Sequence, residues 1–124
     1  STSPVTLNNG SISGGGTPTT VGPKDKFRVP VAILTSNVTA SSGEATLLSF
    51  RGLENTRTFG QPSAGYASGN LIIDMPDGAG LMVTTANDVA RTGEEFSEDP
   101  IVPDVSTDRP EQAATEWLHS QCGQ

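Results

Sequence analysis

The stretch VPVAILTSNVTASSGEATLLSF, residues 29–50, joins an apolar run to a polar turn and a helical pattern. The run at residues 29–34 is continuous and bounded by polar residues, which predicts a strand covered on both faces in a parallel sheet. A helix is expected from Ser42 to about Gly52. Its apolar face would comprise Ala45, Leu47, Leu48 and Gly52. The stretch therefore predicts a strand, turn and helix unit.

The two adjacent serines in the turn permit two interpretations. Ser41 and Glu44 have the spacing of a capping box, in which each side chain satisfies a backbone donor at the helix start. A serine at a strand-to-helix turn can also be a nucleophile, because N–H groups at the positive end of the helix can stabilise an oxyanion. The two roles need nearly the same geometry, so the stretch alone leaves both open.

A nucleophilic serine also needs a partner that accepts its proton. The lysines, Lys24 and Lys26, both precede Ser41, and the one histidine is His119 near the C-terminus. For that histidine we expect an exposed surface position near a frayed helix end. The chain therefore offers a candidate nucleophile without a convincing base.

Length and charge restrict the class of protein. The 124 residues suit one domain but are few for a complete hydrolase with a binding cleft. The 14 acidic and 7 basic residues give a net charge of −7, which disfavours nucleic acid and anionic membranes as partners. The one cysteine, Cys122, permits no internal disulfide. No apolar run reaches the roughly 18 residues of a membrane span, and no signal peptide is recognisable.

The remaining chain divides into a polar start and a structured part. Residues 1–26 are rich in Gly, Ser, Thr and Pro and are expected to be a loop segment, with a short strand around residues 5–7. Residues 55–60 predict a second strand, parallel to the first across the helix, and residues 61–69 predict a loop.

Residues 69–88 predict a β-hairpin, because apolar residues alternate on both sides of Asp77-Gly78. The alternating positions are Leu71, Ile73 and Met75, then Leu81, Val83 and Thr85. The acidic, proline-containing residues 91–106 are expected to form an extended surface segment. In a final helix, Asp108 would cap the start and Pro110 would lie in the first turn. Its apolar face, with Trp117 packed on the sheet, would comprise Ala113, Ala114, Trp117 and Leu118.

Several motifs follow one another in an order that resembles a known family. These are an apolar strand leading to TASSGE, then TFGQPSAG, MPDGAGLMVTTA, IVPD and a terminal helix, together covering about residues 27–118. The order resembles peptidase family S41, which includes the C-terminal processing (tail-specific) and tricorn-type proteases. TASSGE is similar to the Thr-Ala-Ser-x-x-Glu nucleophile motif of that family. The motif serine falls on Ser41, with Ser42 as the alternative.

The resemblance implies an α/β fold with a crotonase/ClpP-like sheet, of which residues 27–124 would be the C-terminal portion of the catalytic domain. It implies a serine peptidase in which Ser41 forms an acyl-enzyme and the Ser42 N–H is an oxyanion donor. No metal or organic cofactor is implied, and the partner is a peptide or protein substrate. Family habit favours the bacterial cell envelope or secretion.

One departure from the family pattern concerns the base. The processing proteases have a lysine in a Thr-Phe-Gly-Lys motif, whereas this chain has Gln61 at that position. Glutamine cannot act as a general base, which excludes a Ser-Lys dyad. The resemblance therefore shifts to the branches typified by tricorn and the nisin-resistance protein. Those use a histidine from the N-terminal part of the polypeptide, so the upstream half is expected to supply the base.

The resemblance implies further site residues. Glu98, just before the Pro-Asp segment, would help to orient the machinery, although a solvated carboxylate is the alternative role. Gln61 and Tyr66 would border a cleft that holds an extended peptide by strand addition along the hairpin edge. An ordinary loop aromatic is the alternative for Tyr66. A catalytically silent domain that binds peptide or apolar ligands is the alternative function, and an acyl-thioester enzyme of related fold fits less well.

Overall fold

The computed structural model describes residues 6–8, 11–13, 19–20 and 28–123. The first three segments are the strands β1 (Thr6–Asn8), β2 (Ser11–Ser13) and β3 (Thr19–Thr20), which form an antiparallel sheet. β1 corresponds to the short strand expected around residues 5–7. β2 and β3 were not expected, because the Gly- and Ser-rich composition of this segment is typical of loops. The division of the chain at residues 26 and 27 stays a prediction.

A parallel sheet contains β4 (Val31–Thr35), β5 (Thr56–Gly60) and β9 (Val105–Ser106), in the order β4-β5-β9. The parallel pairing of β4 with β5 confirms the prediction for residues 29–34 and 55–60. The strands approach each other closely where they end. Gly60 has φ 131°, and a Cβ atom there would overlap the Thr35 carbonyl oxygen. Only glycine fits this position.

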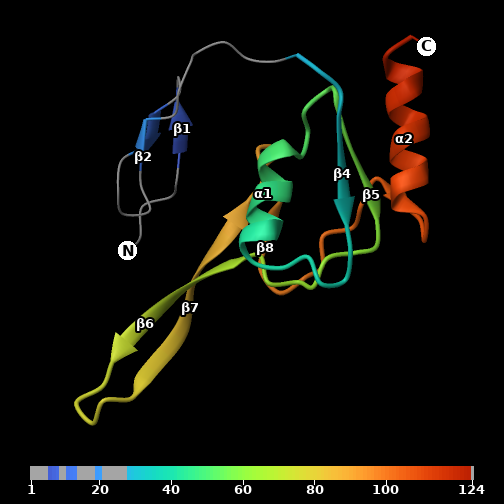
Figure 1. The fold of residues 1–124 in the computed structure, drawn as a ribbon. Helices are drawn as coiled ribbons and strands as arrows, with labels where there is room; N and C mark the ends of the chain where they lie inside the picture. Colours follow the sequence, from blue (N-terminus) through green and yellow to red (C-terminus); the bar gives the residue numbers. More distant parts are fainter. Residues whose placement is uncertain (1–5, 9–10, 14–18, 21–27, 124) are drawn as a thin grey trace.

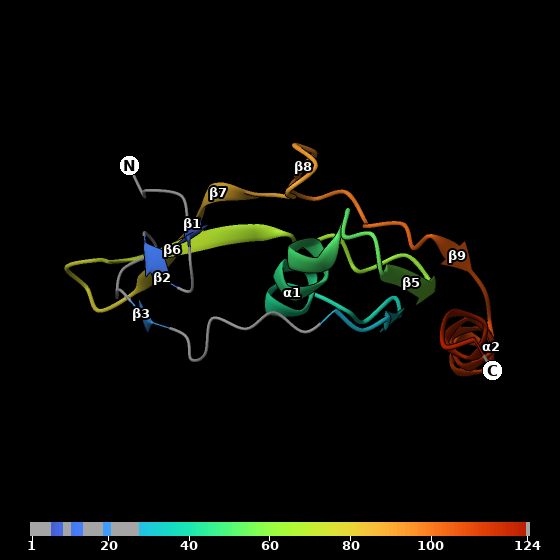
Figure 2. The same ribbon diagram turned by 90° about the horizontal axis from the view of Figure 1, so that it is seen from above.

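Two helices cover the parallel sheet from opposite faces (Figure 2): α1 (Ser42–Phe50) on one side and α2 (Pro110–Gln121) on the other. A core on the α1 side comprises Leu47, Leu48, Ala67, Ala90 and Ile101, with Ile33 and Phe96 packed against it. On the α2 side, the ring centroid of Trp117 lies 5.8 Å from that of Phe59. The prediction that Trp117 packs on the sheet is therefore confirmed.

The buried faces differ in detail from those expected. On α1 the buried residues are Glu44, Leu47 and Leu48, whereas Ala45 is exposed. Their i, i+3, i+4 spacing is that of one helix face, and a glutamate occupies the position next to the two leucines. The helix ends at Phe50, so Gly52 lies beyond it with φ 83°.

The expectation that the apolar run of β4 is covered on both faces is confirmed only in part. Ile33 packs against the core on the α1 side and α2 contacts the strand from the other side, but the cover is incomplete. Leu34 is 46% exposed. Among the described residues β4 pairs only with β5, so it is an edge strand of its sheet.

The predicted hairpin is confirmed and extends away from the helices (Figure 1). It consists of β6 (Ser68–Asp74) and β7 (Gly80–Val89), with Leu71 opposite Val83 and Ile73 opposite Leu81. The turn is closed by a hydrogen bond from the Met75 N–H to the Ala79 carbonyl. β8 (Glu95–Phe96) pairs with the far end of β7.

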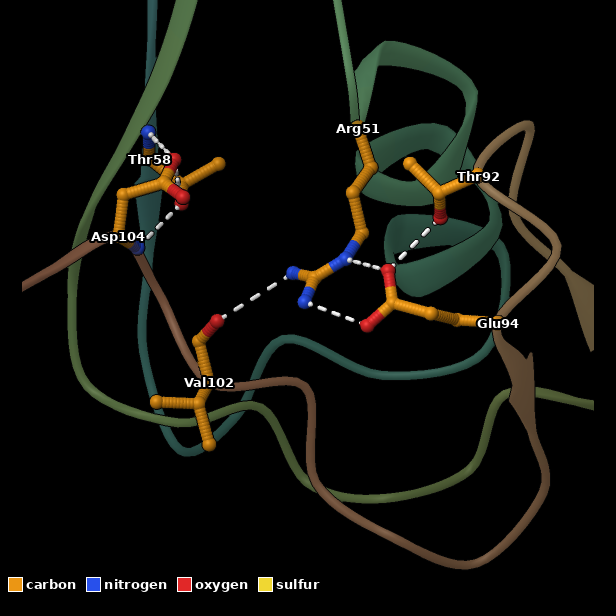
Figure 3. Close-up of polar contacts among 6 residues, drawn as sticks. All are labelled: Arg51, Thr58, Thr92, Glu94, Val102 and Asp104. Atoms are coloured by element: carbon orange, nitrogen blue, oxygen red, sulfur yellow. Dashed lines mark hydrogen bonds and ion pairs between the residues drawn. The ribbon is translucent and has the colours of Figure 1, made fainter.

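The acidic segment at residues 91–106 was expected to be an extended surface segment, and this prediction is wrong in part. The segment contains β8 and β9, and the Ile101 side chain is fully buried in the core. Arg51 at the end of α1 anchors it, with Nε 2.8 Å from Glu94 Oε2 and a weaker hydrogen bond to the Val102 carbonyl (Figure 3). Asp104 Oδ2 in turn accepts hydrogen bonds from the N–H and the hydroxyl of Thr58. Two carboxylates of the acidic segment, those of Glu94 and Asp104, therefore accept hydrogen bonds from residues outside it.

The start of α2 also differs from the prediction. The N-cap is Arg109, and no side chain caps the helix, so Asp108 is not the cap. Its carboxylate instead accepts a hydrogen bond from Gln61. Pro110 does occupy the first turn, and the expected apolar face is at least partly buried. Neither helix of the described residues is long and apolar enough to cross a membrane.

Candidate active site

The turn between β4 and α1 holds Ser41 in an unusual backbone conformation. Ser41 has φ 52° and ψ −116°, and it is the one residue other than glycine with positive φ in the described part of the chain. The Gly43 N–H donates to the Ala40 carbonyl at 2.9 Å, which closes a four-residue turn with Ser41 second. These angles belong to a type II′ turn, in which glycine is normally required. A serine there costs about 1–3 kcal/mol.

This geometry bears on whether Ser41 is a cap or a nucleophile. A sharp, strained strand-to-helix turn that exposes a serine hydroxyl is the arrangement of a nucleophile elbow. Ser41 and Ser42 are both exposed, and no described carbonyl accepts the Ser42 N–H. That N–H lies in the first turn of α1, where the helix dipole favours negative charge. The turn can therefore present a hydroxyl and an oxyanion donor on the same surface.

The capping box predicted from the sequence is present, with Ser41 as the N-cap of α1 and Glu44 at the third helical position. The Ser41 N–H donates to Glu44 Oε2 at 2.8 Å. Glu44 is completely buried, although it carries a carboxylate. Its role therefore extends beyond that of an exposed helix cap.

Four donors surround the Glu44 carboxylate. Oε2 accepts the N–H groups of Ser41 and Tyr66, and Oε1 accepts the Ser63 hydroxyl at 2.6 Å and the Gly65 N–H at 2.8 Å. Burial raises the pKa of Glu44, but these hydrogen bonds outweigh it and hold the pKa below its ordinary value. We refer to Glu44 with these four donors as the Glu44 cluster.

The Glu44 cluster brings the loop after β5 beside the Ser41 turn. The Ala64 N–H also donates to the Thr39 carbonyl at 2.8 Å, a second link between loop and turn. Tyr66 is bound through its backbone only, and its side chain is 64% exposed. The structure thus places the backbone of Tyr66 near that of Ser41, since both N–H groups donate to the same carboxylate oxygen. Its role in binding stays a prediction.

The Glu98 segment passes directly over this loop. Gly65 has φ 86°, and a Cβ atom there would lie 2.6 Å from the Glu98 carbonyl oxygen. The Glu98 side chain is exposed. The chain therefore brings Glu98 to the same loop as Tyr66, while its catalytic role stays a prediction.

Gln61 and His119 point to other parts of the molecule. Gln61 Nε2 donates to Asp108 Oδ1 at 2.6 Å, next to the start of α2. His119 is exposed in the last turn of α2. α2 ends at the end of the sheet opposite to that where α1 begins (Figure 1). Lys24 and Lys26 lie outside the described residues, and among the described residues no lysine or histidine lies at the Ser41 turn.

The sequence did not reveal two buried polar groups near the site. Ser63 gave no motif signal beyond a loop composition. Asp88 on β7 is partly buried, and its N–H donates to the Ala67 carbonyl. Burial raises the pKa of Asp88, and the negative charge of Glu44 raises it further.

A groove of about 500 Å³ lies elsewhere, between Phe50, Arg57 and Trp117, and none of the residues of the Ser41 turn lines it.

Comparison with protein families identifies the relationship. The model of peptidase family S41 matches residues 6–107, which is most of the chain. The chain belongs to peptidase family S41. The match includes the Ser41 turn, the Glu44 cluster and the Glu98 segment, and it confirms the resemblance found in the sequence motifs.

Individual relatives agree with this membership. The chain is 40% identical over 119 residues to the nisin-resistance protein of Lactococcus lactis subsp. lactis, covering 95% of this chain and 37% of that protein. A lipoprotein from Streptococcus agalactiae has 44% identity and a TM-score of 0.71, over 77% of this chain and 33% of the other. The photosystem II D1 C-terminal processing protease has 25% identity and a TM-score of 0.58, over 65% and 21%.

The S41 fold predicted for this chain is therefore confirmed. The parallel and antiparallel sheets with two helices correspond to the α/β catalytic domain of S41 proteases, consistent with its C-terminal portion. The chain spans about a third of the length of the first two relatives that it matches.

Proposed function

We propose that this chain carries the nucleophile of a serine peptidase, with Ser41 as the attacking residue. The observation that supports Ser41 most is its backbone conformation, φ 52° and ψ −116°, at the turn from β4 into α1. A strained residue is retained where surrounding structure and function require it. Ser42, the alternative nucleophile, is the first residue of α1 and does not have this strained conformation.

The reaction would proceed through an acyl-enzyme. The Ser41 hydroxyl oxygen forms a bond to the scissile carbonyl carbon as its proton passes to a general base. The resulting oxyanion accepts a hydrogen bond from the Ser42 N–H. The peptide C–N bond then breaks as the base protonates the leaving amine. Water hydrolyses the ester in the second half-reaction. We assign the base to an upstream segment of the polypeptide, following the histidine-dependent branches of the family.

The substrate would be an extended peptide beside the hairpin. Among the described residues β6 pairs only with β7, so its other edge is open, and it begins two residues after Tyr66. An open edge can bind a peptide by adding a strand. The apolar face of the hairpin is exposed at Leu71, Ile73, Leu81 and Val83. One relative is named for nisin resistance, so nisin belongs among the substrates to be tested.

The test compares Ser41→Ala and Ser42→Ala in the full-length polypeptide with extended peptides and nisin as substrates. We expect Ser41→Ala to abolish hydrolysis with the fold intact, and Ser42→Ala to keep measurable activity because its backbone N–H remains. Loss with Ser42→Ala alone would contradict the assignment. Peptide binding without hydrolysis by the wild-type protein would favour the alternative, a catalytically silent domain.

A further inference from the structure

We propose that Glu44 is a positioning residue that holds the nucleophile turn and the substrate loop in one arrangement. The inference rests on the proposed function of Ser41. It concerns a residue that touches neither the scissile bond nor its oxyanion. Its support is the Glu44 cluster, in which one buried carboxylate joins segments that are far apart in the chain.

Both segments meet at a single oxygen atom. Glu44 Oε2 accepts the Ser41 N–H at 2.8 Å and the Tyr66 N–H at 2.9 Å. The first bond restrains the residue with the strained backbone. The second bond restrains Tyr66, which lies two residues before the start of β6, the strand with the open edge. A displacement of this oxygen would therefore move the nucleophile and the substrate loop together.

A third segment is linked through Ser63. Its hydroxyl donates to Glu44 Oε1 at 2.6 Å and accepts the Ile101 N–H at 2.8 Å. The Ser63 N–H also donates to the Ile101 carbonyl at 3.1 Å. Ile101 anchors the end of the segment that carries Glu98. Through Ser63, the carboxylate of Glu44 sets the position of this segment as well.

Only an ionised carboxylate satisfies this arrangement. An ionised glutamate accepts hydrogen bonds at both oxygens, with about four acceptor sites in all. Glutamine has one acceptor oxygen, and its NH₂ group would face two donors. Because Glu44 is completely buried, no solvent can replace the lost bonds. Glu44→Gln would therefore release either the Ser41 and Tyr66 N–H groups or the Ser63 and Gly65 donors.

The experiment measures Ser41 reactivity separately from substrate binding. The full-length polypeptide is labelled with a fluorophosphonate, and the labelling rate per folded molecule is compared with kcat and KM for a peptide substrate. We expect Glu44→Gln to lower the labelling rate and kcat by about 100-fold, the effect of a displacement of about 1 Å at a reacting group. KM should rise at the same time.

Two variants separate positioning from general stability. Trp117→Ala removes the contact with the Phe59 ring on the α2 side of the sheet, away from the Glu44 cluster. It should lower the melting temperature while the labelling rate stays within about twofold. Ser63→Ala keeps the bond from Ser41 to Glu44, so it should raise KM more than it lowers the labelling rate. If Glu44→Gln does not fold, this pattern in Ser63→Ala decides the question.

The outcomes distinguish this inference from the proposed function. A wild-type protein that is not labelled at Ser41 overturns both. A labelled wild-type protein with an unchanged labelling rate in folded Glu44→Gln overturns the positioning role alone. The same holds if Ser63→Ala changes neither KM nor the labelling rate, or if Trp117→Ala slows labelling as much as Glu44→Gln.

Discussion

The side chains of Gln61 and Asp108 are hydrogen-bonded, with Gln61 Nε2 2.6 Å from Asp108 Oδ1. This contact joins the residue after β5 to the start of α2. It occupies the side chain at the position where the processing proteases have a lysine. We therefore expect that Gln61→Lys does not create a Ser-Lys dyad, because the new ammonium group would pair with Asp108 and remain protonated. The measurement is peptide hydrolysis in a full-length polypeptide from which the histidine proposed as the upstream base is removed.

The double variant Gln61→Lys with Asp108→Asn is the control for that ion pair. It removes the carboxylate that would hold the lysine, and we expect it to be inactive as well, because a free side chain is not positioned at Ser41. Robust hydrolysis by Gln61→Lys alone would show that the dyad geometry is preserved.

His119 is expected to be dispensable. It lies in the last turn of α2 and is exposed, at the far end of the sheet from the Ser41 turn. We predict that His119→Ala changes kcat/KM of the full-length polypeptide by less than about twofold, and that residues 1–124 alone show no significant peptidase activity. Activity in residues 1–124 that disappears with His119→Ala would make Ser41 and His119 the dyad.

Gly65 is predicted to be essential for the loop that carries Tyr66. Gly65→Ala should lower the free energy of unfolding by clearly more than about 1 kcal/mol, because it combines positive φ with a clash against the Glu98 carbonyl. Gly78→Ala is the matched control, since its φ is 85° but nothing lies within 4 Å. Chemical denaturation of both variants checks this. Equal losses would show that the Glu98 segment moves aside freely.

Asp88 is predicted to reduce stability at neutral pH. Its folded-state pKa lies above the ordinary value of 3.8, first because of burial and then because of Glu44. A raised carboxyl pKa disfavours folding once the group ionises, so the penalty develops as the pH rises above 3.8. Asp88→Asn should therefore raise the melting temperature at pH 7 and leave it nearly unchanged at pH 3. Asp74→Asn, on the exposed hairpin, is the control. A lower melting temperature for Asp88→Asn at pH 7 would contradict the predicted penalty.

The elements that local patterns specify could be predicted from the sequence. The apolar run of β4, the Asp77-Gly78 hairpin and the apolar face of α2 each follow from periodicity and turn chemistry. β8 and β9 were missed because two-residue strands carry no period and form only through pairing with a distant strand. Burial was wrong where it depended on tertiary partners, as for Leu34, Ala45 and Ile101.

The candidate site was predicted in part. Ser41 and Glu44 are recognisable because their motif is contiguous. The links from Glu44 to Gly65 and Tyr66 could not be predicted, because they join residues about 20 positions apart through backbone donors that any sequence provides. The link to Ser63 uses the hydroxyl of a loop serine that gave no motif signal. Asp108 was assigned to the helix cap by its spacing. Its partner Gln61, which follows the neighbouring strand β5, was visible only in three dimensions.

The central claim, that Ser41 is the nucleophile, is tested most directly by locating a covalent adduct. The full-length polypeptide is treated with a fluorophosphonate, digested, and sequenced by tandem mass spectrometry across residues 29–51. The account predicts one phosphonyl group on Ser41, absent from Ser41→Ala and from denatured protein. An adduct on Ser42, or no adduct while the protein hydrolyses peptides, would contradict it.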